Sequence, residues 1–202
     1  MLPEIKIIEK PDWVSWDDIK QCLVDAHAVN RARGINMSHY QWPAEKIREY
    51  IGHDGVILVA LDGKKVVGTA AISRKVSDGW FAKGEYAYMC FASVLPQYNG
   101  QGIYSRLIQL REKIALEQNY TVFVLDTHEK NTKIRKISQS NDYSLVGYFR
   151  TMNNDHYNVI LAKWVAGCPY SKLYCKFRFN LSWIKAHLYV MLKNVKSIFS
   201  II

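Results

Sequence analysis

The chain has 202 residues, of which 49% are hydrophobic and 22% are charged, a composition typical of a globular domain. This composition excludes disordered, collagen-like and low-complexity chains. No apolar run approaches the roughly 18 residues of a membrane-spanning helix, and the first residues contain acids and a proline where a signal peptide has an apolar core. We therefore expect a cytoplasmic protein.

The net charge of +9 is concentrated in one part of the chain. No Asp or Glu follows Asp155, whereas residues 156–202 contain seven Lys and Arg, so this segment carries +7 and the first 155 residues only +2. Because the main part of the chain is nearly neutral, nucleic acid is not expected as a partner.

The four cysteines form no C-x-x-C pair, so their spacing indicates neither a zinc site nor a disulfide framework. No bound metal is expected. We predict reduced, buried thiols at Cys22, Cys90, Cys168 and Cys175.

Taken in chain order, the first half predicts a strand, two helices and a hairpin. A short strand is expected over residues 5–8. Ser15 can cap a helix that runs to Arg33, and Pro43 suits the first turn of a second helix that ends near Gly52. The apolar runs at 56–61 and 66–73 flank Asp62-Gly63, a dipeptide that favours the tight turn of an antiparallel hairpin.

The second half predicts strands and helices in alternation, then another hairpin. A strand over 85–94 is followed by an amphipathic helix with apolar residues at Ile103, Leu107, Leu110 and Ile114. Further elements are expected as follows: a buried parallel strand over 121–125, a helix over 132–140, and strands over 143–149 and 156–164 around Asn153-Asn154-Asp155.

The resulting order, βααβββαβαββ, predicts an α/β fold in which helices cover a mixed sheet. Gly167 and Pro169 mark the end of this domain. We therefore predict one domain over residues 1–166 and a basic helical extension over residues 167–202.

The most informative segment joins the strand over 85–94 to the next helix. Its sequence, VLPQYNGQGIYSRL over residues 94–107, places Gly100 and Gly102 directly before a helix N-terminus. Glycines let the backbone turn without Cβ clashes, and the free N–H groups of the first helical turn point at any anion that approaches. The spacing matches neither a Walker A loop nor G-x-G-x-x-G, so it predicts a backbone cradle for phosphate or a tight turn without ligand.

This segment resembles the phosphate loop of the GNAT superfamily of acyl-CoA-dependent N-acyltransferases, which follows a strand ending in Val-x-Pro and reads approximately P-x-Y-R-G-x-G-I-G. The matching residues are PQYNGQGIY at 96–104, with Asn99 in place of the arginine and Tyr104 in place of the last small residue. The resemblance covers about residues 4–165, including TVFVLDT at 121–127 and the helix-opening Asn131. It implies the GNAT-like acyl-CoA N-acyltransferase fold.

The resemblance also implies acetyl-CoA as the acyl donor. Loss of the arginine weakens the electrostatic part of phosphate binding, but the backbone donors of the loop remain. The strand backbone before the loop is implied as the donor to the oxyanion. The residues implied in cofactor binding are Ala92, Ser93, Val94, Asn99, Gly100, Gln101, Gly102, Ile103, Tyr104 and Asn131.

The chemistry implied is direct transfer of the acetyl group to a primary amine, with both substrates bound together. Glu85, at the start of its strand, is the candidate base for the amine, the alternative being an exposed strand-end carboxylate. The family's acidic tyrosine would fall on Ser138, so Tyr143 is the candidate acid for the leaving thiolate. His128 could also serve as a base, although a solvated loop histidine is the simpler interpretation.

The acceptor is expected near the loop between the first two helices. Residues there suit an anionic or sugar-like molecule, although an ordinary loop surface explains them equally well: Arg31, Arg33, His39, Tyr40 and Trp42. We therefore favour a small-molecule amine such as an amino sugar or a surface-glycan precursor. The missing tyrosine at position 138 leaves one alternative open, a non-catalytic acyl-CoA-binding module with a C-terminal helix that docks on a membrane or a partner.

Residues 172–202 predict a basic amphipathic helix, because apolar residues recur at alternating intervals of four and three. They are Phe177, Leu181, Ile184, Leu188, Met191, Val195 and Ile198. Two destinations are open for this stripe. One is packing on the chain's own core or on a second copy in a homodimer, and the other is peripheral contact with the inner face of an anionic membrane.

Overall fold

The computed structural model describes residues 4–35, 38–150 and 157–199. The chain divides into two compact units, Met1–Val124 and Leu125–Ile202, and the boundary lies inside strand β5 (Val122–His128). The predicted division after residue 166 stays a prediction.

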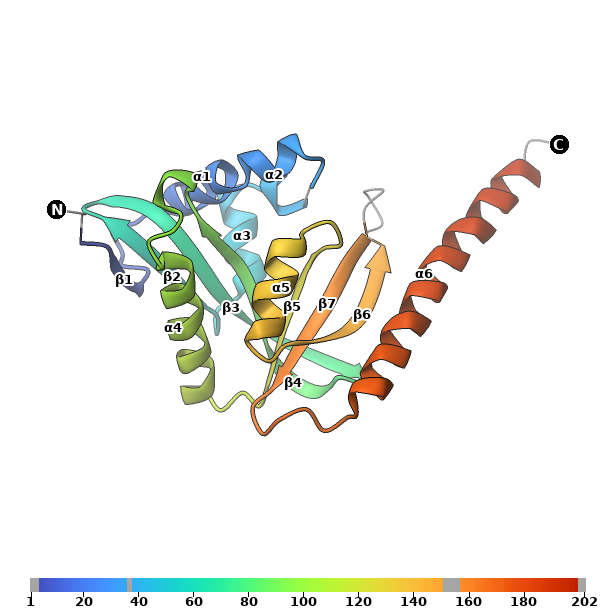
Figure 1. Cartoon of the computed structure of the whole chain (residues 1–202). Coiled ribbons are helices and arrows are strands. Elements are labelled where there is room, and N and C mark those ends of the chain that lie inside the picture. Colours follow the sequence, from blue (N-terminus) through green and yellow to red (C-terminus); the bar gives the residue numbers. More distant parts are fainter. Residues whose placement is uncertain (1–3, 36–37, 151–156, 200–202) are drawn as a thin grey trace. The chain divides into compact units, whose positions relative to one another are not determined.

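The first unit contains four strands, four helices and the start of β5 (Figure 1). Its chain begins with β1 (Lys6–Glu9), α1 (Trp16–Ala26), α2 (Ala28–Ala32), the 3-10 helix η1 (Ser38–Gln41) and α3 (Ala44–Ile51). It continues with β2 (Val56–Asp62), β3 (Lys65–Gly79), β4 (Ala82–Val94), the 3-10 turn η2 (Pro96–Tyr98) and α4 (Ile103–Glu117). Consecutive strands from β1 to β4 pair antiparallel, and β4 pairs in parallel with β5 at Ala87↔Phe123 and Tyr88↔Val124.

The second unit contains the end of β5, then α5 (Thr132–Ser140), β6 (Ser144–Arg150), β7 (Tyr157–Trp164) and the long helix α6 (Lys172–Phe199). Strands β6 and β7 pair antiparallel, and α6 contacts β6. The strand order is β1-β2-β3-β4-β5-β7-β6, a mixed sheet that confirms the predicted α/β fold class. Within the described part of the chain, no helix combines the length and the apolar character needed to cross a bilayer.

Strand β3 lies at the centre of the first unit and is covered on both faces. Successive side chains of a strand point to opposite faces, yet every residue from Val66 to Ile72 is buried. Helices α1 and α4 both contact β3, and each turns an apolar stripe inward. The stripe of α1 contains Ile19, Cys22 and Leu23, and Ile103 and Leu107 lead that of α4.

The helix predicted from Ser15 to Arg33 is broken in two at His27. Ser15 caps α1 as predicted, in a capping box with Asp18. At the other end, the guanidinium Nη1 of Arg31 donates to the carbonyl of Val24 at 2.6 Å, which satisfies a carbonyl that the end of α1 leaves free. This contact links α2 to the end of α1, and Gly34 follows α2 with a φ of 71°.

Strand β5 is longer than predicted, because it continues through Asp126 and Thr127 to His128. The prediction of a solvated loop histidine is therefore wrong, since His128 is only 1% exposed. Its ring Nδ1 accepts a hydrogen bond from the backbone N–H of Lys130 at 3.0 Å. The turn predicted at Asn153-Asn154-Asp155 lies outside the described residues.

The cysteines differ in exposure. Cys22, Cys90 and Cys175 are buried free thiols as predicted, whereas Cys168 is exposed, so the prediction of burial is wrong at this position. Cys168 lies in the connection between β7 and α6. Its Sγ is 3.8 Å from that of Cys175.

These environments predict a clear order of thiol reactivity, because the thiolate is the form that attacks an alkylating agent. Burial raises the pKa of Cys22 to about 12, and burial together with Cys168 raises the pKa of Cys175 to about 11. Limited iodoacetamide treatment near neutral pH should therefore modify Cys168 first, as measured by peptide mass spectrometry. In denaturant all four thiols should react alike, and modification of Cys22 as fast as Cys168 in the folded protein would contradict the structure.

Candidate functional site

The backbone of β4 is bulged near its C-terminal end. Thr69 of β3 pairs with Ser93 and Ala71 pairs with Cys90, so Phe91 and Ala92 together oppose a single residue of β3. Phe91 has a φ of 50°, a conformation that costs a side-chain-bearing residue about 1 kcal/mol or more. The bulge takes Phe91 and Ala92 out of the regular ladder, which resumes at Thr69↔Ser93 and Gly68↔Val94.

Two buried side chains hold the carbonyls of the bulge. The hydroxyl of Thr69 donates to the Phe91 carbonyl at 2.7 Å and lies 2.9 Å from the hydroxyl of Ser93. From the other side, Nη1 of Arg111 on α4 donates to the Cys90 carbonyl at 3.3 Å, and Arg111 is only 2% exposed. Among the described residues, its Nε has no hydrogen-bond partner. Hydrogen bonds from β3 to the Phe91 carbonyl and from α4 to the Cys90 carbonyl thus support the bulge.

The predicted phosphate loop follows the bulge directly. Gly100 and Gly102 have φ values of 81° and 71°, and Gly102 is the N-cap of α4. No side chain caps this helix, and no acidic residue occupies its first turn. A Cβ placed on either glycine would meet no atom within 4 Å. The helix therefore presents free N–H groups to open space, as an anion site requires.

Tyr98 fixes the near end of the phosphate loop. Its hydroxyl donates to a carboxylate oxygen of Asp62 at 2.7 Å, and this hydrogen bond raises the pKa of Tyr98. Asp62 belongs to the turn between β2 and β3, whose register Asp62↔Lys65 confirms the predicted hairpin. The loop is therefore tied to the sheet by a side chain at each end, Tyr98 at the start and buried Ile103 at the start of α4.

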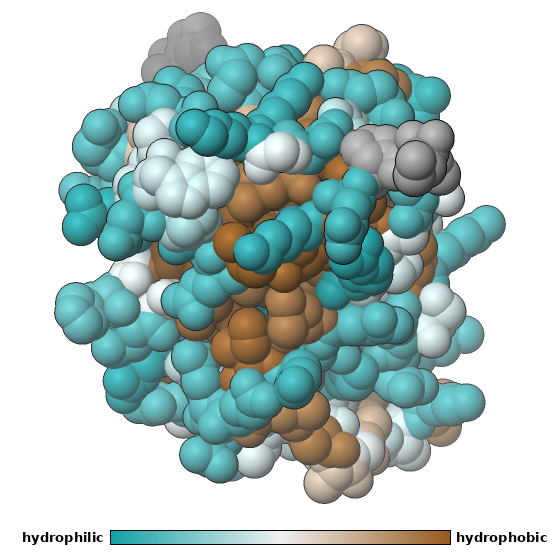
Figure 2. Space-filling model, turned by 90° about the vertical axis from the view of Figure 1, so that its left-hand side faces the viewer, coloured by the Kyte–Doolittle hydropathy of each residue, from teal (hydrophilic) through white to brown (hydrophobic). Residues whose placement is uncertain are grey.

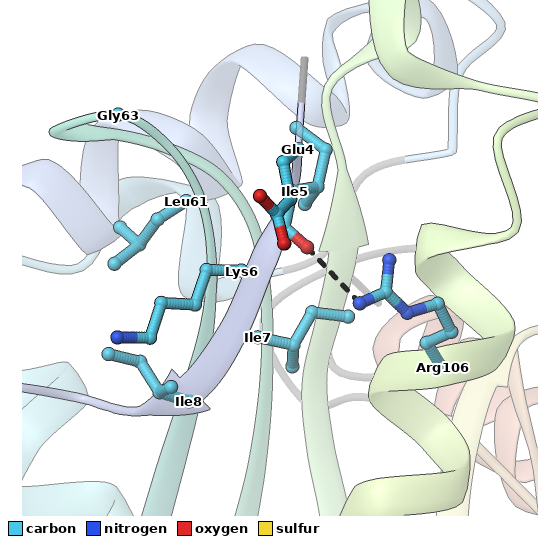
Figure 3. A pocket seen from close by; sticks show the side chains of 8 residues that line it. All are labelled: Glu4, Ile5, Lys6, Ile7, Ile8, Leu61, Gly63 and Arg106. Atoms are coloured by element: carbon cyan, nitrogen blue, oxygen red, sulfur yellow. Dashed lines mark hydrogen bonds between the residues drawn. The ribbon is translucent and has the colours of Figure 1, made fainter. Parts of the chain in front are cut away.

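A surface hollow of about 660 Å³ lies beside this loop, along β1 (Figure 3). Its lining mixes apolar residues with the charged Glu4, Lys6 and Arg106. In Figure 2 hydrophobic residues gather in the centre of the side of the molecule that carries β1. The guanidinium of Arg106 lines the hollow and donates to the carbonyl of Ile5 at 3.1 Å. None of the predicted site residues lines it. Arg106 therefore does not replace the arginine that the resemblance lacks at Asn99.

An aromatic cluster surrounds the bulge residue Phe91. His39, Trp42 and Tyr50 lie with ring centroids 5.4, 6.4 and 5.7 Å from that of Phe91, and Tyr88 lies 6.1 Å from Tyr50. Burial lowers the pKa of His39 to about 3, with a smaller effect from His27, so its imidazole is neutral at physiological pH. We call these five rings the Phe91 cluster.

The Phe91 cluster bears directly on the predicted acceptor region. His39 and Trp42 lie next to the bulge as an acceptor site would require, while Arg31 instead binds the end of α1 and Arg33 is exposed. The side chain of Tyr40 is outside the described part. Tyr50 and Phe91 were not predicted as site residues, because nothing in their local sequence indicates that a bulge brings them together.

Glu85 lies at the far end of β4 from the bulge, in an ion pair with Arg74 of β3. Arg74 also pairs with Asp54 at 3.3 Å. The seven residue steps from Glu85 to Ala92 span about 23 Å of extended strand. Glu85 therefore lies beyond direct hydrogen-bond reach of an amine at the bulge. Its role as base stays a prediction.

The remaining predicted residues lie in the second unit. Asn131 caps α5, with its side-chain oxygen accepting from the N–H of Ile134 at 3.4 Å and its Nδ2 donating to Thr127 Oγ1 at 3.1 Å. Tyr143 is only 4% exposed, and its backbone N–H donates to the carbonyl of Ser138 at 3.1 Å. Tyr143 thus lies five residues after Ser138, where the family's tyrosine was expected, and is joined to it by this backbone hydrogen bond. The roles of Asn131 and Tyr143 stay predictions.

The sequence profile of the acetyltransferase (GNAT) family matches residues 16–137. No curated protein matches the chain. Among solved structures, a GNAT-family acetyltransferase from Staphylococcus aureus Mu50 aligns with a TM-score of 0.62 at 16% identity, over 80% of this chain and 99% of that chain. An acetyltransferase from Streptococcus agalactiae 2603 aligns with a TM-score of 0.60 at 20% identity, over 79% and 98%.

A third structure, of the NatC complex bound to Gag peptide and CoA, contains a chain that aligns with a TM-score of 0.63 at 15% identity, over 80% of this chain and 98% of that chain. At such identities the likeness shows the fold, and it confirms the predicted GNAT-like fold. The profile match covers more than half of the sequence, and the chain therefore belongs to the acetyltransferase (GNAT) family.

Proposed function

We propose that this protein transfers the acetyl group of acetyl-CoA to a primary amine of a small molecule, directly and with both substrates bound. Family membership supports acetyl transfer in general. The observation that carries the proposal is the uncapped N-terminus of α4, which follows the β4 bulge after a loop with two left-handed glycines.

In this proposal one set of backbone groups binds acetyl-CoA and another stabilises the reaction. Bound acetyl-CoA supplies an activated thioester carbonyl. The backbone N–H groups from Gly100 to Tyr104 hold the pyrophosphate, whereas that of Asn99 donates to the Pro96 carbonyl at 3.1 Å. The strand backbone of Ala92, Ser93 and Val94 donates to the oxyanion. Because Thr69 and Arg111 fix the bulge, these donors are in place before the acetyl group arrives, which is the condition under which such donors accelerate a reaction most.

The Phe91 cluster suggests the class of the acceptor. Its rings and its neutral His39 offer aromatic faces, which suit the C–H face of a sugar ring. The ammonium groups of Lys46 and Lys75 lie 4.8 and 4.2 Å from the ring centroids of Trp42 and Tyr50. Arg31, one of the cations predicted to favour an anionic acceptor, is bound to the Val24 carbonyl. We therefore propose an amino sugar or a related glycan precursor as the acceptor.

A turnover assay tests this function. The full-length protein is incubated with acetyl-CoA and either an amino sugar such as glucosamine or a short peptide with a free N-terminus, and acetylated products are identified by mass spectrometry. We expect the acetylated amino sugar. Acetylation of the peptide alone would contradict the small-molecule acceptor, and acetyl-CoA binding without any turnover would support the alternative of a non-catalytic acyl-CoA-binding module.

The proposed base gives a separate prediction. If Glu85 accepts the amine proton, kcat of the Glu85→Gln variant should fall by roughly tenfold or more and the rise of the rate with pH should flatten, because the amine loses its proton acceptor. The matched variant Arg74→Met removes the ion-pair partner of Glu85 and should keep the activity. A kcat of Glu85→Gln within about twofold of the wild type would exclude Glu85 as the base.

A further inference from the structure

Helix α6 packs on the rest of its unit through one side only. The rings of Tyr157 and His187 stack with their centroids 4.7 Å apart, and Phe179 meets Tyr148 edge to face at 5.9 Å. Cys175, one turn before Phe179, is buried on the same side of the helix. These contacts fix which side of α6 faces the β6–β7 pair, and therefore which side faces outward.

The outward side carries an apolar stripe. At about 100° per residue, four large apolar residues fall on one line on the side opposite to Phe179. They are Leu173, Phe177, Ile184 and Leu188, with exposed fractions of 77%, 59%, 46% and 51%. This outer stripe does not pack on the chain's own core. The sequence continues the same spacing at Met191, Val195 and Ile198, whose side chains lie outside the described part.

Basic residues flank the outer stripe on both sides. Lys176 and Lys185 lie about 90° around the helix from its centre, in opposite directions, and both are exposed. Trp183, 45% exposed, adds an aromatic ring of the type that settles at the boundary between water and lipid. No acidic residue occurs between positions 156 and 202, so nothing in this segment neutralises the basic residues.

We propose that this face of α6 lies on the surface of an anionic membrane. The outer stripe would enter the headgroup region, and Lys176 and Lys185 would lie against lipid phosphates on either side. A second copy of the chain fits less well, because two such faces would bring lysines together with no carboxylate between them. The remaining candidate is another protein with an apolar groove and an acidic rim. Vesicle binding distinguishes this candidate from a membrane.

The experiment is vesicle sedimentation with the full-length protein and no acetyl-CoA or amine, so its result is independent of the proposed acetyl transfer. Vesicles of phosphatidylglycerol and phosphatidylcholine should pellet the protein, and added salt should weaken this binding. Vesicles of phosphatidylcholine alone should bind it at least roughly fivefold more weakly, because the lysine contribution is lost.

The variant Phe177→Glu/Ile184→Glu should bind the anionic vesicles more weakly by roughly tenfold or more. Two apolar side chains that would enter the headgroup region are then replaced by charged ones. The matched control Leu116→Glu/Val165→Glu makes the same charge change at two exposed apolar residues outside α6 and should keep most of the binding. All four positions are exposed, and circular dichroism and thermal unfolding verify that both variants fold.

Three results would overturn the proposal. The first is undiminished vesicle binding by Phe177→Glu/Ile184→Glu. The second is equal binding to neutral and anionic vesicles. The third is absence of vesicle binding by the full-length protein. If that protein forms a dimer that Phe177→Glu/Ile184→Glu dissociates, the outer stripe binds a second copy of the chain. If it is a monomer, the outer stripe binds a different protein.

Discussion

Gly102→Trp is expected to remove acetyl-CoA binding while leaving the fold intact. The Cβ position of Gly102 meets no protein atom within 4 Å, so the indole does not clash with the chain itself. It instead fills the space in front of the free N–H groups of α4, where the pyrophosphate is expected. Isothermal titration with acetyl-CoA and with CoA should show affinity reduced by roughly 100-fold or more, because both the anion contacts and the space are lost.

The strain of the new side chain needs its own control. Gly102 has a φ of 71°, which costs a side-chain-bearing residue about 1–2 kcal/mol. Gly34 has the same φ of 71° and equally open surroundings at the end of α2, so Gly34→Trp imposes the same strain away from the phosphate loop. Gly34→Trp should lose similar stability and keep acetyl-CoA binding. Undiminished binding by Gly102→Trp would mean that the loop is a plain turn.

Elements with a strong local signal could be predicted closely from the sequence. Helix α5 begins at Thr132 and ends at Ser140 as predicted, because Asn131 accepts the N–H of Ile134 as an N-cap should. The phosphate loop could be found for a similar reason. Only glycine adopts a positive φ freely, so two glycines before a helix report the backbone conformation through residue identity alone.

Features that depend on distant parts of the chain could not be predicted. Phe91 has a positive φ although phenylalanine does not favour it, and the hydroxyl of Thr69 that supports this conformation is 22 residues away. On α4 the predicted stripe contained Leu110 and Ile114, but the most buried positions there are Arg111 and Ala115. An arginine can be buried at such a position because the Cys90 carbonyl of β4 accepts its hydrogen bond, which no local pattern shows.

The same long-range contact gives the second large prediction, for Thr69→Val. Valine keeps the shape of threonine but loses the hydroxyl, so the buried carbonyl of Phe91 is left without its donor. We expect the free energy of unfolding to fall by about 1–3 kcal/mol. This hydrogen bond stabilises the positive φ of Phe91. Without it the bulge should also relax and move the N–H groups of Ala92 to Val94. Loss of aligned oxyanion donors should lower kcat by roughly 10- to 100-fold.

Two controls separate the position of the donors from simple loss of stability. Thr69→Ser keeps the hydroxyl and should retain most of the activity, because it can still donate to the Phe91 carbonyl. Ile72→Val removes one methyl group from a buried residue of the same strand, costs about 1 kcal/mol, and should leave kcat unchanged. Since the phosphate loop is not altered in any of these variants, acetyl-CoA affinity should stay close to that of the wild type. If Thr69→Val and Ile72→Val lost activity only in proportion to stability, the bulge would have no catalytic role, and the oxyanion donors of the transfer would have to lie elsewhere.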